Sequence, residues 1–175
     1  GVVACPIVTD YPVDRYESLK NELKPKLIID DLNKLKEIKI KNNNIYQFQG
    51  NNNSIMLFSS GTTGESKGIL HTTSSLIASA KSFAKLSGMS ERTVIYHHFP
   101  MHYMAGIFNM FLCPMVSGGK IVLGKRFSSE HMLTFWDTPK RHGVNNLTLT
   151  PTMAIALIKV FRHDNNIMKY IQSIG

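Results

Sequence analysis

A chain of 175 residues with 43% hydrophobic residues and a formal net charge of +8 is long enough for one domain with a buried core. No apolar run reaches the length that crosses a bilayer, which excludes a membrane-spanning helix. The lysines are spread along the chain without interleaved aromatic residues, so the charge favours a solvated surface, with a basic nucleic-acid-binding module as the alternative.

Strand and helix patterns alternate along the sequence. In the first half of the chain they predict a helix over 14–23, strands over 26–30 and 55–59, a short strand at 69–70 and a helix over 74–86. In the second half they predict a strand over 93–96, a buried helix over 104–115, a strand over 120–123, a helix over 130–141, a strand over 146–149 and a helix over 151–161. Ser128 or Ser129 is the expected cap of the helix over 130–141. This alternation predicts an α/β fold, with a layered, mostly parallel sheet flanked by helices. Ligands then bind beyond the carboxyl ends of the strands.

The strand over 55–59 runs into a loop that is typical of phosphate binding. The loop, SSGTTGESKG from Ser59 to Gly68, combines glycines that let backbone N–H groups converge, hydroxyl donors and a lysine charge. It is not a Walker A loop, because Gly68 follows Lys67 where that motif places a Mg²⁺-binding hydroxyl. Its composition and position favour a strand–loop–strand phosphate site over the alternative, a plain surface turn.

This loop resembles the signature loop of the adenylate-forming superfamily, which includes acyl-CoA synthetases, aryl-CoA ligases, peptide-synthetase adenylation domains and luciferases. The usual pattern, Ser-Gly-Thr-Thr-Gly-x-Pro-Lys-Gly, is matched at Ser60, Gly61, Thr62, Thr63, Gly64, Lys67 and Gly68. Ser66 replaces the usual proline, which predicts a looser loop with the same chemistry.

A second stretch fits the same family. Its pattern Pro-x-x-(His or aromatic)-x-x-Gly is matched between Pro100 and Gly106, where Tyr103 takes the position of the ring that lines the acyl and adenylate pocket. His102 precedes it, so the resemblance leaves open which of these two rings contacts the reacting carboxylate. A metal site is not predicted here, because the spacing of His97, His98 and His102 matches no usual zinc pattern.

Amino-acid-activating members of the superfamily place Asp next to that ring, whereas this chain has Met104. A buried ammonium without a counter-charge is costly, so an α-amino acid substrate is disfavoured. The neighbouring apolar residues suggest a pocket wall, with simple core packing as the alternative for at least half of them: Met104, Ile107, Phe108 and Phe111.

The resemblance implies ATP-dependent activation of a small-molecule carboxylic acid to an acyl adenylate, followed by thioester formation with a thiol acceptor. We expect a fatty or aryl acid–CoA ligase of fatty acid metabolism; the alternative is an adenylation domain that loads a phosphopantetheine carrier. Mg²⁺ is implied, with no ligand visible. The implied catalytic residues are Lys67, His102 and Tyr103, and the implied ATP-binding residues are Ser59, Ser60, Gly61, Thr62, Thr63, Gly64 and Lys67.

The order of the predicted elements follows the family over nearly the whole chain. Both ends interrupt a pattern, so we expect residues 1–175 to be part of the N-terminal, AMP-binding domain of a larger ligase, without its C-terminal domain and inactive alone. Cys5 and Cys113 stand in apolar surroundings, which favours reduced thiols and a cytoplasmic location.

Overall fold

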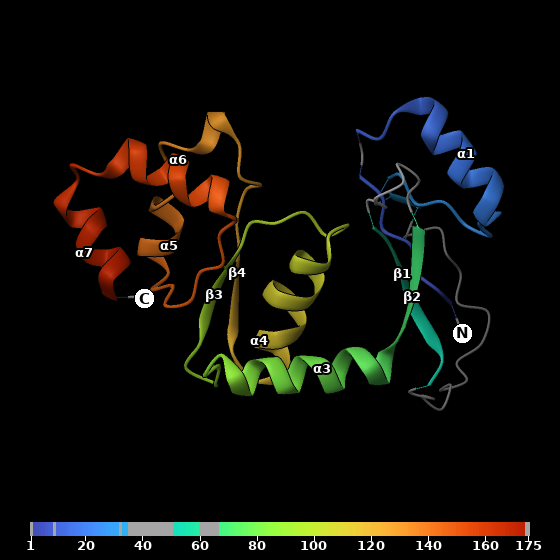
Figure 1. Cartoon of the computed structure of the whole chain (residues 1–175), viewed down its shortest axis with the longest axis horizontal. Helices are drawn as coiled ribbons and strands as arrows, with labels where there is room; N and C mark the ends of the chain where they lie inside the picture. Colours follow the sequence, from blue (N-terminus) through green and yellow to red (C-terminus); the bar gives the residue numbers. More distant parts are fainter. Residues whose placement is uncertain (1, 9, 32, 35–50, 60–66, 174–175) are drawn as a thin grey trace. The chain divides into compact units, whose positions relative to one another are not determined.

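The computed structural model describes residues 2–8, 10–31, 33–34, 51–59 and 67–173, whose elements are drawn in Figure 1. The chain separates into two compact units, one of Gly1–Pro6 with Gly50–Gly175 and the other of Ile7–Gln49. The larger unit carries the described strands and both sequence motifs. No described helix is at once long enough and apolar enough to cross a membrane.

The smaller unit contains helix α1 (Val13–Leu23), which confirms the helix predicted over 14–23 to within one residue. The helix ends at Lys24, whose φ of 45° is left-handed. The strand predicted over 26–30 is wrong, and Leu27 and Ile29 are 57% and 47% exposed. A strand needs a neighbour for its backbone N–H and C=O groups, and none pairs with this stretch in the described part of the unit.

Strands β1 (Asn53–Ser59) and β2 (Lys67–Thr72) form an antiparallel hairpin in the larger unit. Ala4 adds a parallel bridge to Ile55, and its backbone N–H donates to the Ser54 carbonyl over 2.9 Å. The two strands predicted on either side of the glycine-rich loop are therefore confirmed.

Helix α3 (Thr73–Leu86) follows β2 directly. The Thr72 side chain caps it by accepting from the backbone N–H of Ser75 over 3.2 Å. Its apolar residues recur every three to four positions, so one face is buried: Leu76, Ala80 and Ala84.

Strands β3 (Val94–His97) and β4 (Lys120–Leu123) pair in parallel. Ile95 also forms a parallel bridge with Asn146, but the strand predicted over 146–149 is reduced to that bridge. One reason is that the Thr148 carbonyl accepts from a histidine side chain instead of joining a ladder. The expected α/β fold is confirmed, but the mostly parallel sheet is not seen among the described strands, which form two separate two-stranded sheets, antiparallel at β1–β2 and parallel at β3–β4.

The connection from β3 to β4 runs through a π-helix, η1 (Ala105–Leu112), and helix α4 (Cys113–Val116). Both pack on α3, where Ala80, Ala84 and Cys113 form a buried cluster. The expectation that helix 104–115 is buried all round is only partly correct. Its inner face is buried, whereas Phe111 is 36% and Met115 55% exposed.

The helix predicted over 130–141 is wrong as a continuous element. The stretch forms a short 3₁₀ turn, η2 (Ser129–His131), and helix α5 (Asp137–Arg141), and Ser128 makes no capping hydrogen bond. Pro139 is tolerated in the first turn of α5, but in a helix that began near residue 130 it would lie in the interior, where its missing N–H breaks the hydrogen-bond ladder. The intervening turn lets the adjacent Phe135 and Trp136, 4% and 2% exposed, both enter the core.

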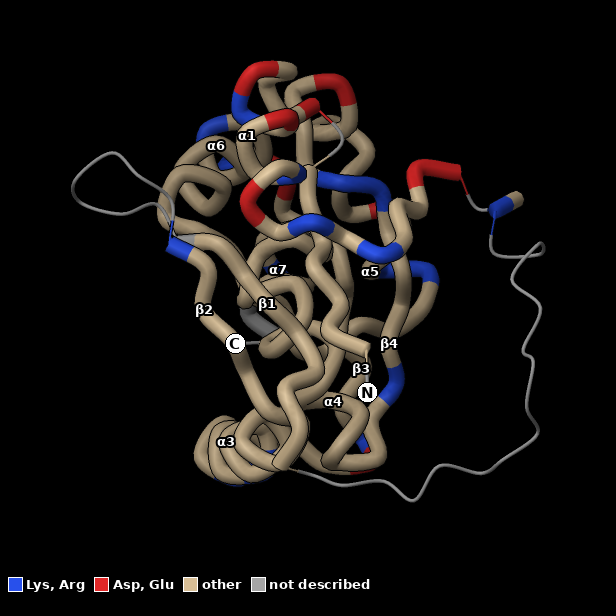
Figure 2. Tube along the Cα trace, turned by 90° about the vertical axis from the view of Figure 1, so that its right-hand side faces the viewer, with Lys and Arg blue, Asp and Glu red and all other residues tan. Residues whose placement is uncertain are grey.

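Helices α6 (Pro151–Phe161) and α7 (Asn165–Ser173) end the described chain. Helix α6 has the predicted bounds, with Thr150 as its cap. Both helices contribute to the main core: Tyr96, Phe135, Trp136, Val144, Leu157 and Ile167. Lysine and arginine are scattered over several elements and do not follow one continuous strip (Figure 2).

Candidate functional site

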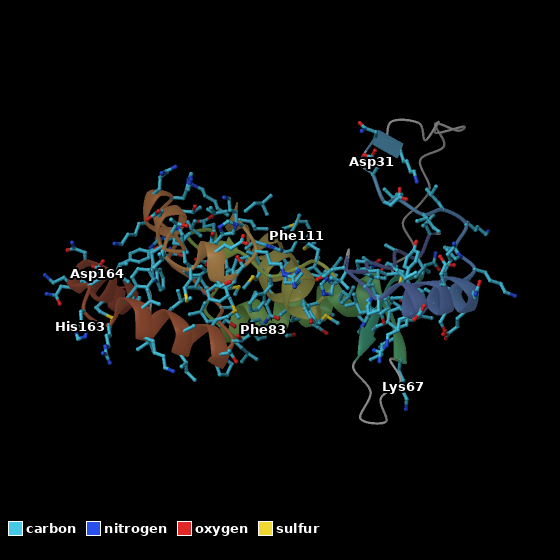
Figure 3. The ribbon with its side chains drawn as sticks, turned by 90° about the horizontal axis from the view of Figure 1, so that it is seen from above. Asp31, Lys67, Phe83, Phe111, His163 and Asp164 are labelled. Atoms are coloured by element: carbon cyan, nitrogen blue, oxygen red, sulfur yellow. The ribbon has the colours of Figure 1, made fainter. Side chains whose placement is uncertain are left out.

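The β1–β2 hairpin places Ser59 and Lys67 opposite each other as the last pair of its ladder. Lys67 is exposed and projects from the end of β2 (Figure 3). The described residues do not include five of the predicted phosphate-binding residues: Ser60, Gly61, Thr62, Thr63 and Gly64. Their role stays a prediction, and the two strands that flank them have the arrangement expected of a strand–loop–strand phosphate site.

Gly68 determines how closely the first residues of β2 approach β1. A Cβ at this position would lie 3.0 Å from Sδ of Met56 and 3.3 Å from Cε1 of Phe58. A larger residue would therefore press on the ends of these two side chains, which would have to give way. The glycine after the lysine thus has a local packing reason.

The turn from Pro100 to Gly106 is held by close backbone contacts. The N–H of Tyr103 donates to the Pro100 carbonyl over 3.2 Å, and the N–H of Gly106 donates to the Tyr103 carbonyl over 3.1 Å. A Cβ on Gly106 would clash with the Pro100 carbonyl oxygen. Only glycine fits this position without moving the turn, which explains the last residue of the motif.

His102 and Tyr103 lie side by side at this turn. Their ring centroids are 4.4 Å apart and the rings are tilted by 41°. Tyr103 is 57% exposed, and His102 is partly buried. The structure brings the two rings together, and neither of them lines the two pockets described below. Contact with a substrate carboxylate stays a prediction for both.

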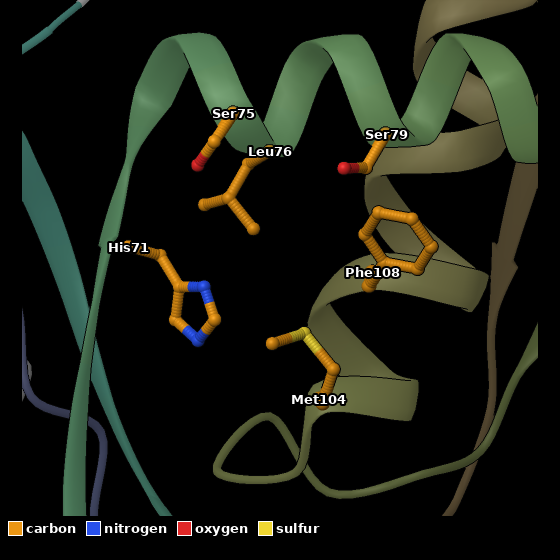
Figure 4. A pocket seen from close by; sticks show the side chains of 6 residues that line it. All are labelled: His71, Ser75, Leu76, Ser79, Met104 and Phe108. Atoms are coloured by element: carbon orange, nitrogen blue, oxygen red, sulfur yellow. The ribbon is translucent and has the colours of Figure 1, made fainter.

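A pocket of about 250 Å³ lies beside this turn, between β2, α3 and η1 (Figure 4). We call it the β2–α3–η1 pocket. Its described lining residues are His71, Ser75, Leu76, Ser79, Met104 and Phe108. None of these residues carries a carboxylate. An acid could thus enter it without meeting a like charge.

The π-helix sets which apolar residues reach this pocket. The N–H of Cys113 bonds to the Phe108 carbonyl five residues back, and this wider turn is a feature that often occurs at functional sites. Met104 and Phe108 line the pocket. Ile107 is instead buried and Phe111 is 36% exposed, so half of the four predicted wall residues lie in the wall.

His97 and His98 are buried side chains that bond to backbone carbonyls. Nε2 of His97 lies 3.1 Å from the Gly106 carbonyl oxygen, and Nε2 of His98 lies 2.9 Å from that of Thr148. Burial lowers the pKa of His98 from 6.5 to about 4, so its ring is neutral at pH 7. In the described ranges, no three His, Cys, Asp or Glu residues gather as metal ligands.

Sequence reasoning missed the polar side of the β2–α3–η1 pocket. His71 is the next-to-last residue of β2, and Ser75 and Ser79 lie one helical turn apart on α3. The spacing of the two serines beside buried Leu76 was the available signal, since i and i+4 share a helix face. No local sequence pattern indicated that η1 would form the opposite wall of this pocket.

Comparison with known proteins gives the chain's relatives. The family described as AMP-binding enzyme matches residues 2–174. Sulfoacetate–CoA ligase of Cupriavidus necator is 29% identical over 105 residues, which are 60% of this chain and 20% of that protein. Human mitochondrial malonate–CoA ligase is 27% identical over 114 residues, which are 65% of this chain and 20% of that protein.

A solved structure has the same fold over a similar share of the chain. O-succinylbenzoate coenzyme A synthetase of Bacillus subtilis, in complex with AMP, gives a TM-score of 0.56 at 27% identity. The match covers 64% of this chain and 22% of that one. The chain therefore spans about a fifth of the length of the curated relatives it matches.

Proposed function

Because the chain belongs to the family of AMP-binding enzymes, we propose that it supplies the phosphate-binding hairpin and part of the acid site of an ATP-dependent acid–thiol ligase. The single observation that carries the proposal is the pairing of Ser59 with Lys67, which holds the two ends of a glycine- and hydroxyl-rich loop together. The β2–α3–η1 pocket, reached from the same β2, adds a candidate place for the acid.

In the first proposed step, a carboxylate oxygen of the acid bonds to the α-phosphorus of ATP. The bond from that phosphorus to the bridging oxygen breaks, and pyrophosphate leaves with the added negative charge. Lys67 and the donors of the loop from Ser59 onwards fit the β- and γ-phosphates, because a lysine charge and convergent donors stabilise spreading phosphate charge. The thiol sulfur then loses its proton and bonds to the acyl carbon, the bond from that carbon to the phosphate oxygen breaks, and AMP leaves with that oxygen.

Mg²⁺ would accompany ATP in this reaction. The described part of the chain offers no gathered set of carboxylates to hold the ion. Mg²⁺ usually keeps several waters and binds substrate phosphates directly. We therefore assign it no ligand and no step in this chain.

The proposed substrate is a short carboxylic acid without an α-ammonium group, and the proposed thiol is CoA. The acid class is supported by Met104 and Phe108 in a pocket of about 250 Å³, whose described lining has no carboxylate to pair with an ammonium. Two relatives are named for sulfoacetate and malonate, which supports a short acid over a long fatty acid. A phosphopantetheine carrier is the alternative acceptor, and a cytoplasmic location stays a prediction.

The decisive experiment gives a panel of carboxylic acids to the complete ligase that contains this chain. Acid-dependent release of pyrophosphate and CoA-dependent loss of free thiol would support the proposal. Release of pyrophosphate with a carrier protein but not with CoA would favour the carrier alternative. Absence of both, together with salt-sensitive binding of duplex nucleic acid, would replace it with the nucleic-acid-binding alternative.

We also propose that residues 1–175 belong to the AMP-binding domain of that larger ligase and cannot adenylate an acid alone. The share of the relatives that the chain covers, about a fifth, supports this. Acid-dependent ATP–pyrophosphate exchange by the isolated 175-residue chain would contradict it.

A further inference from the structure

A second pocket, of about 240 Å³, lies beyond the carboxyl end of β4, where the chain continues towards α5. We call it the β4–α5 pocket. Tyr96 lines it from β3, whereas the next residue, His97, contacts Gly106 on the other face of that strand. The two pockets share no lining residue.

Basic side chains dominate the rim of the β4–α5 pocket. Lys125 and Arg126 come from the segment after β4, and Arg141 comes from the last turn of α5. His131 adds an imidazole ring to the lining. Asp137 is the single carboxylate among the described lining residues, which together keep a net positive charge.

The three cations of the rim are not neutralised by ion pairs. Among the described residues, the ion pairs within 4.0 Å are Lys20–Glu17 and Lys34–Asp30, both in the smaller unit. Asp137 thus shares the lining with the cations without pairing with one. Unpaired cations around a concave site raise the local concentration of anions.

The floor of the pocket is aromatic and close-packed. Phe135 makes edge contacts with Tyr96 and Phe127, with ring centroids 5.4 and 5.6 Å apart. A Cβ on Gly124 would clash with the Tyr96 ring, so glycine at this position lets the chain that follows β4 pass close to that ring. Burial raises the pKa of Tyr96. These contacts fix the floor beneath the charged rim.

We propose that the β4–α5 pocket binds an anionic oxygen group, a carboxylate, sulfonate or phosphate, attached to a short or ring-containing carbon body. Arg126 and Arg141 can each present two N–H donors to such a group, and the aromatic floor can cover the carbon body. The group has two candidate sources: a second acidic group on the acid, or a phosphate of the thiol cofactor. The choice between these two sources rests on the proposed ligase function, whereas the binding of an anion does not.

Trp136 offers a direct readout on the 175-residue chain. It is the single tryptophan, is 2% exposed, and its ring centroid lies 5.1 Å from that of Phe135 in the pocket floor. We would titrate the chain with malonate, inorganic phosphate and adenosine 3′,5′-bisphosphate and follow tryptophan fluorescence. Uncharged malonamide serves as the ligand control. A saturable change with at least one anion, weakened by added salt, is the expected result.

The double variant Arg126→Gln/Arg141→Gln should weaken that binding by about tenfold or more, because charged hydrogen bonds are lost. Lys81→Gln/Lys85→Gln removes two charges from exposed positions of α3, away from the pocket, and should bind as the original chain does. If the first double variant fails to fold by circular dichroism, Arg126→Lys keeps the charge, loses the two-donor fork and should still weaken binding.

The outcomes separate the pocket from the ligase reaction. Tighter binding of malonate assigns the pocket to an acidic group of the acid, and tighter binding of the bisphosphate assigns it to the cofactor phosphate. No saturable response to any of the three anions, or equal weakening in the α3 control, overturns the proposal. Because no turnover is measured, this result stands apart from that of the acid panel.

Discussion

Nε2 of His97 lies 3.1 Å from the carbonyl oxygen of Gly106, and this contact ties the end of β3 to the first turn of η1. A carbonyl oxygen can only accept, so the ring nitrogen carries the proton and donates it. The same nitrogen lies 3.1 Å from Sδ of Met101. The histidine therefore holds both sides of the turn that bears His102 and Tyr103.

Replacing this anchor should destabilise the chain. We expect His97→Ala to lower the free energy of unfolding by about 1–3 kcal/mol, because the buried Gly106 carbonyl loses its donor. Urea unfolding followed by circular dichroism measures the change. His142→Ala, at an exposed position, is the control and should stay within about 0.5 kcal/mol of the original chain. Equal midpoints for the two variants would contradict the role of His97.

Gly106→Ala tests the close approach of the turn to η1. The new Cβ would clash with the Pro100 carbonyl, so we expect a loss of about 2–3 kcal/mol from overpacking. Gly143→Ala is the contrast, since its φ of 61° is left-handed but no atom lies within 4 Å of the added Cβ. It should cost about 1 kcal/mol. A larger loss at Gly143 would refute the steric explanation, as read by thermal or urea unfolding.

Stability should fall as the pH is lowered from 6.5 to about 4, through protonation of His98 in the unfolded chain. Burial lowers the pKa of the folded residue to about 4, and neighbouring His97 lowers it further to a smaller extent. The unfolded chain therefore binds a proton in this window that the folded chain does not, which costs about 3 kcal/mol of stability across it.

His98→Gln removes this titration while keeping a donor for the Thr148 carbonyl. Urea unfolding of both chains at a series of pH values measures the difference between them, in which the other titrating groups cancel. The original chain should lose more stability than the variant as the pH falls. Parallel pH profiles would show that His98 titrates normally.

Lys67→Met should abolish most of the acid-dependent pyrophosphate release in the complete ligase. The variant removes the positive charge that we place against the β- and γ-phosphates, so we expect a fall in kcat of about 10²–10³-fold. Lys81→Met, at an exposed position of α3, is the matched control and should leave kcat unchanged. Wild-type activity of the Lys67 variant would remove this lysine from the site.

Ser79→Leu tests whether the β2–α3–η1 pocket takes the acid. The larger side chain enters the space that Ser79 shares with Met104 and Phe108, so we expect KM for the acid to rise about tenfold or more. Ser82→Leu makes the same change on α3 at an exposed position outside the pocket. It should leave KM unchanged, and a KM that is equal in both variants would place the acid elsewhere.

Local signals predicted the elements whose ends are set by local chemistry. Helix α6 has the predicted bounds because Thr150 caps it and Pro151 fits its first turn. The hairpin strands were likewise visible as apolar runs on either side of the glycine-rich loop. The strand over 26–30 failed because strands depend on partners, and the helix over 130–141 failed because burial of Phe135 and Trp136 overrides helical spacing.

Only the parts of the candidate site that belong to one of the two sequence motifs were predictable. The pairing of Ser59 with Lys67 and the need for glycine at Gly106 follow from the two motifs. The polar wall from His71, Ser75 and Ser79 depends on how η1 packs against α3. That packing joins residues about 30 positions apart, and no local pattern encodes it.

Cys113 is fully buried beside Ala80 and Ala84, and burial raises the pKa of its thiol to about 11. At pH 7 about one molecule in 10⁴ carries the thiolate, which is the form that attacks acyl groups. Burial also raises the pKa of Cys5. Burial thus favours the neutral, weakly nucleophilic form of both thiols of this chain.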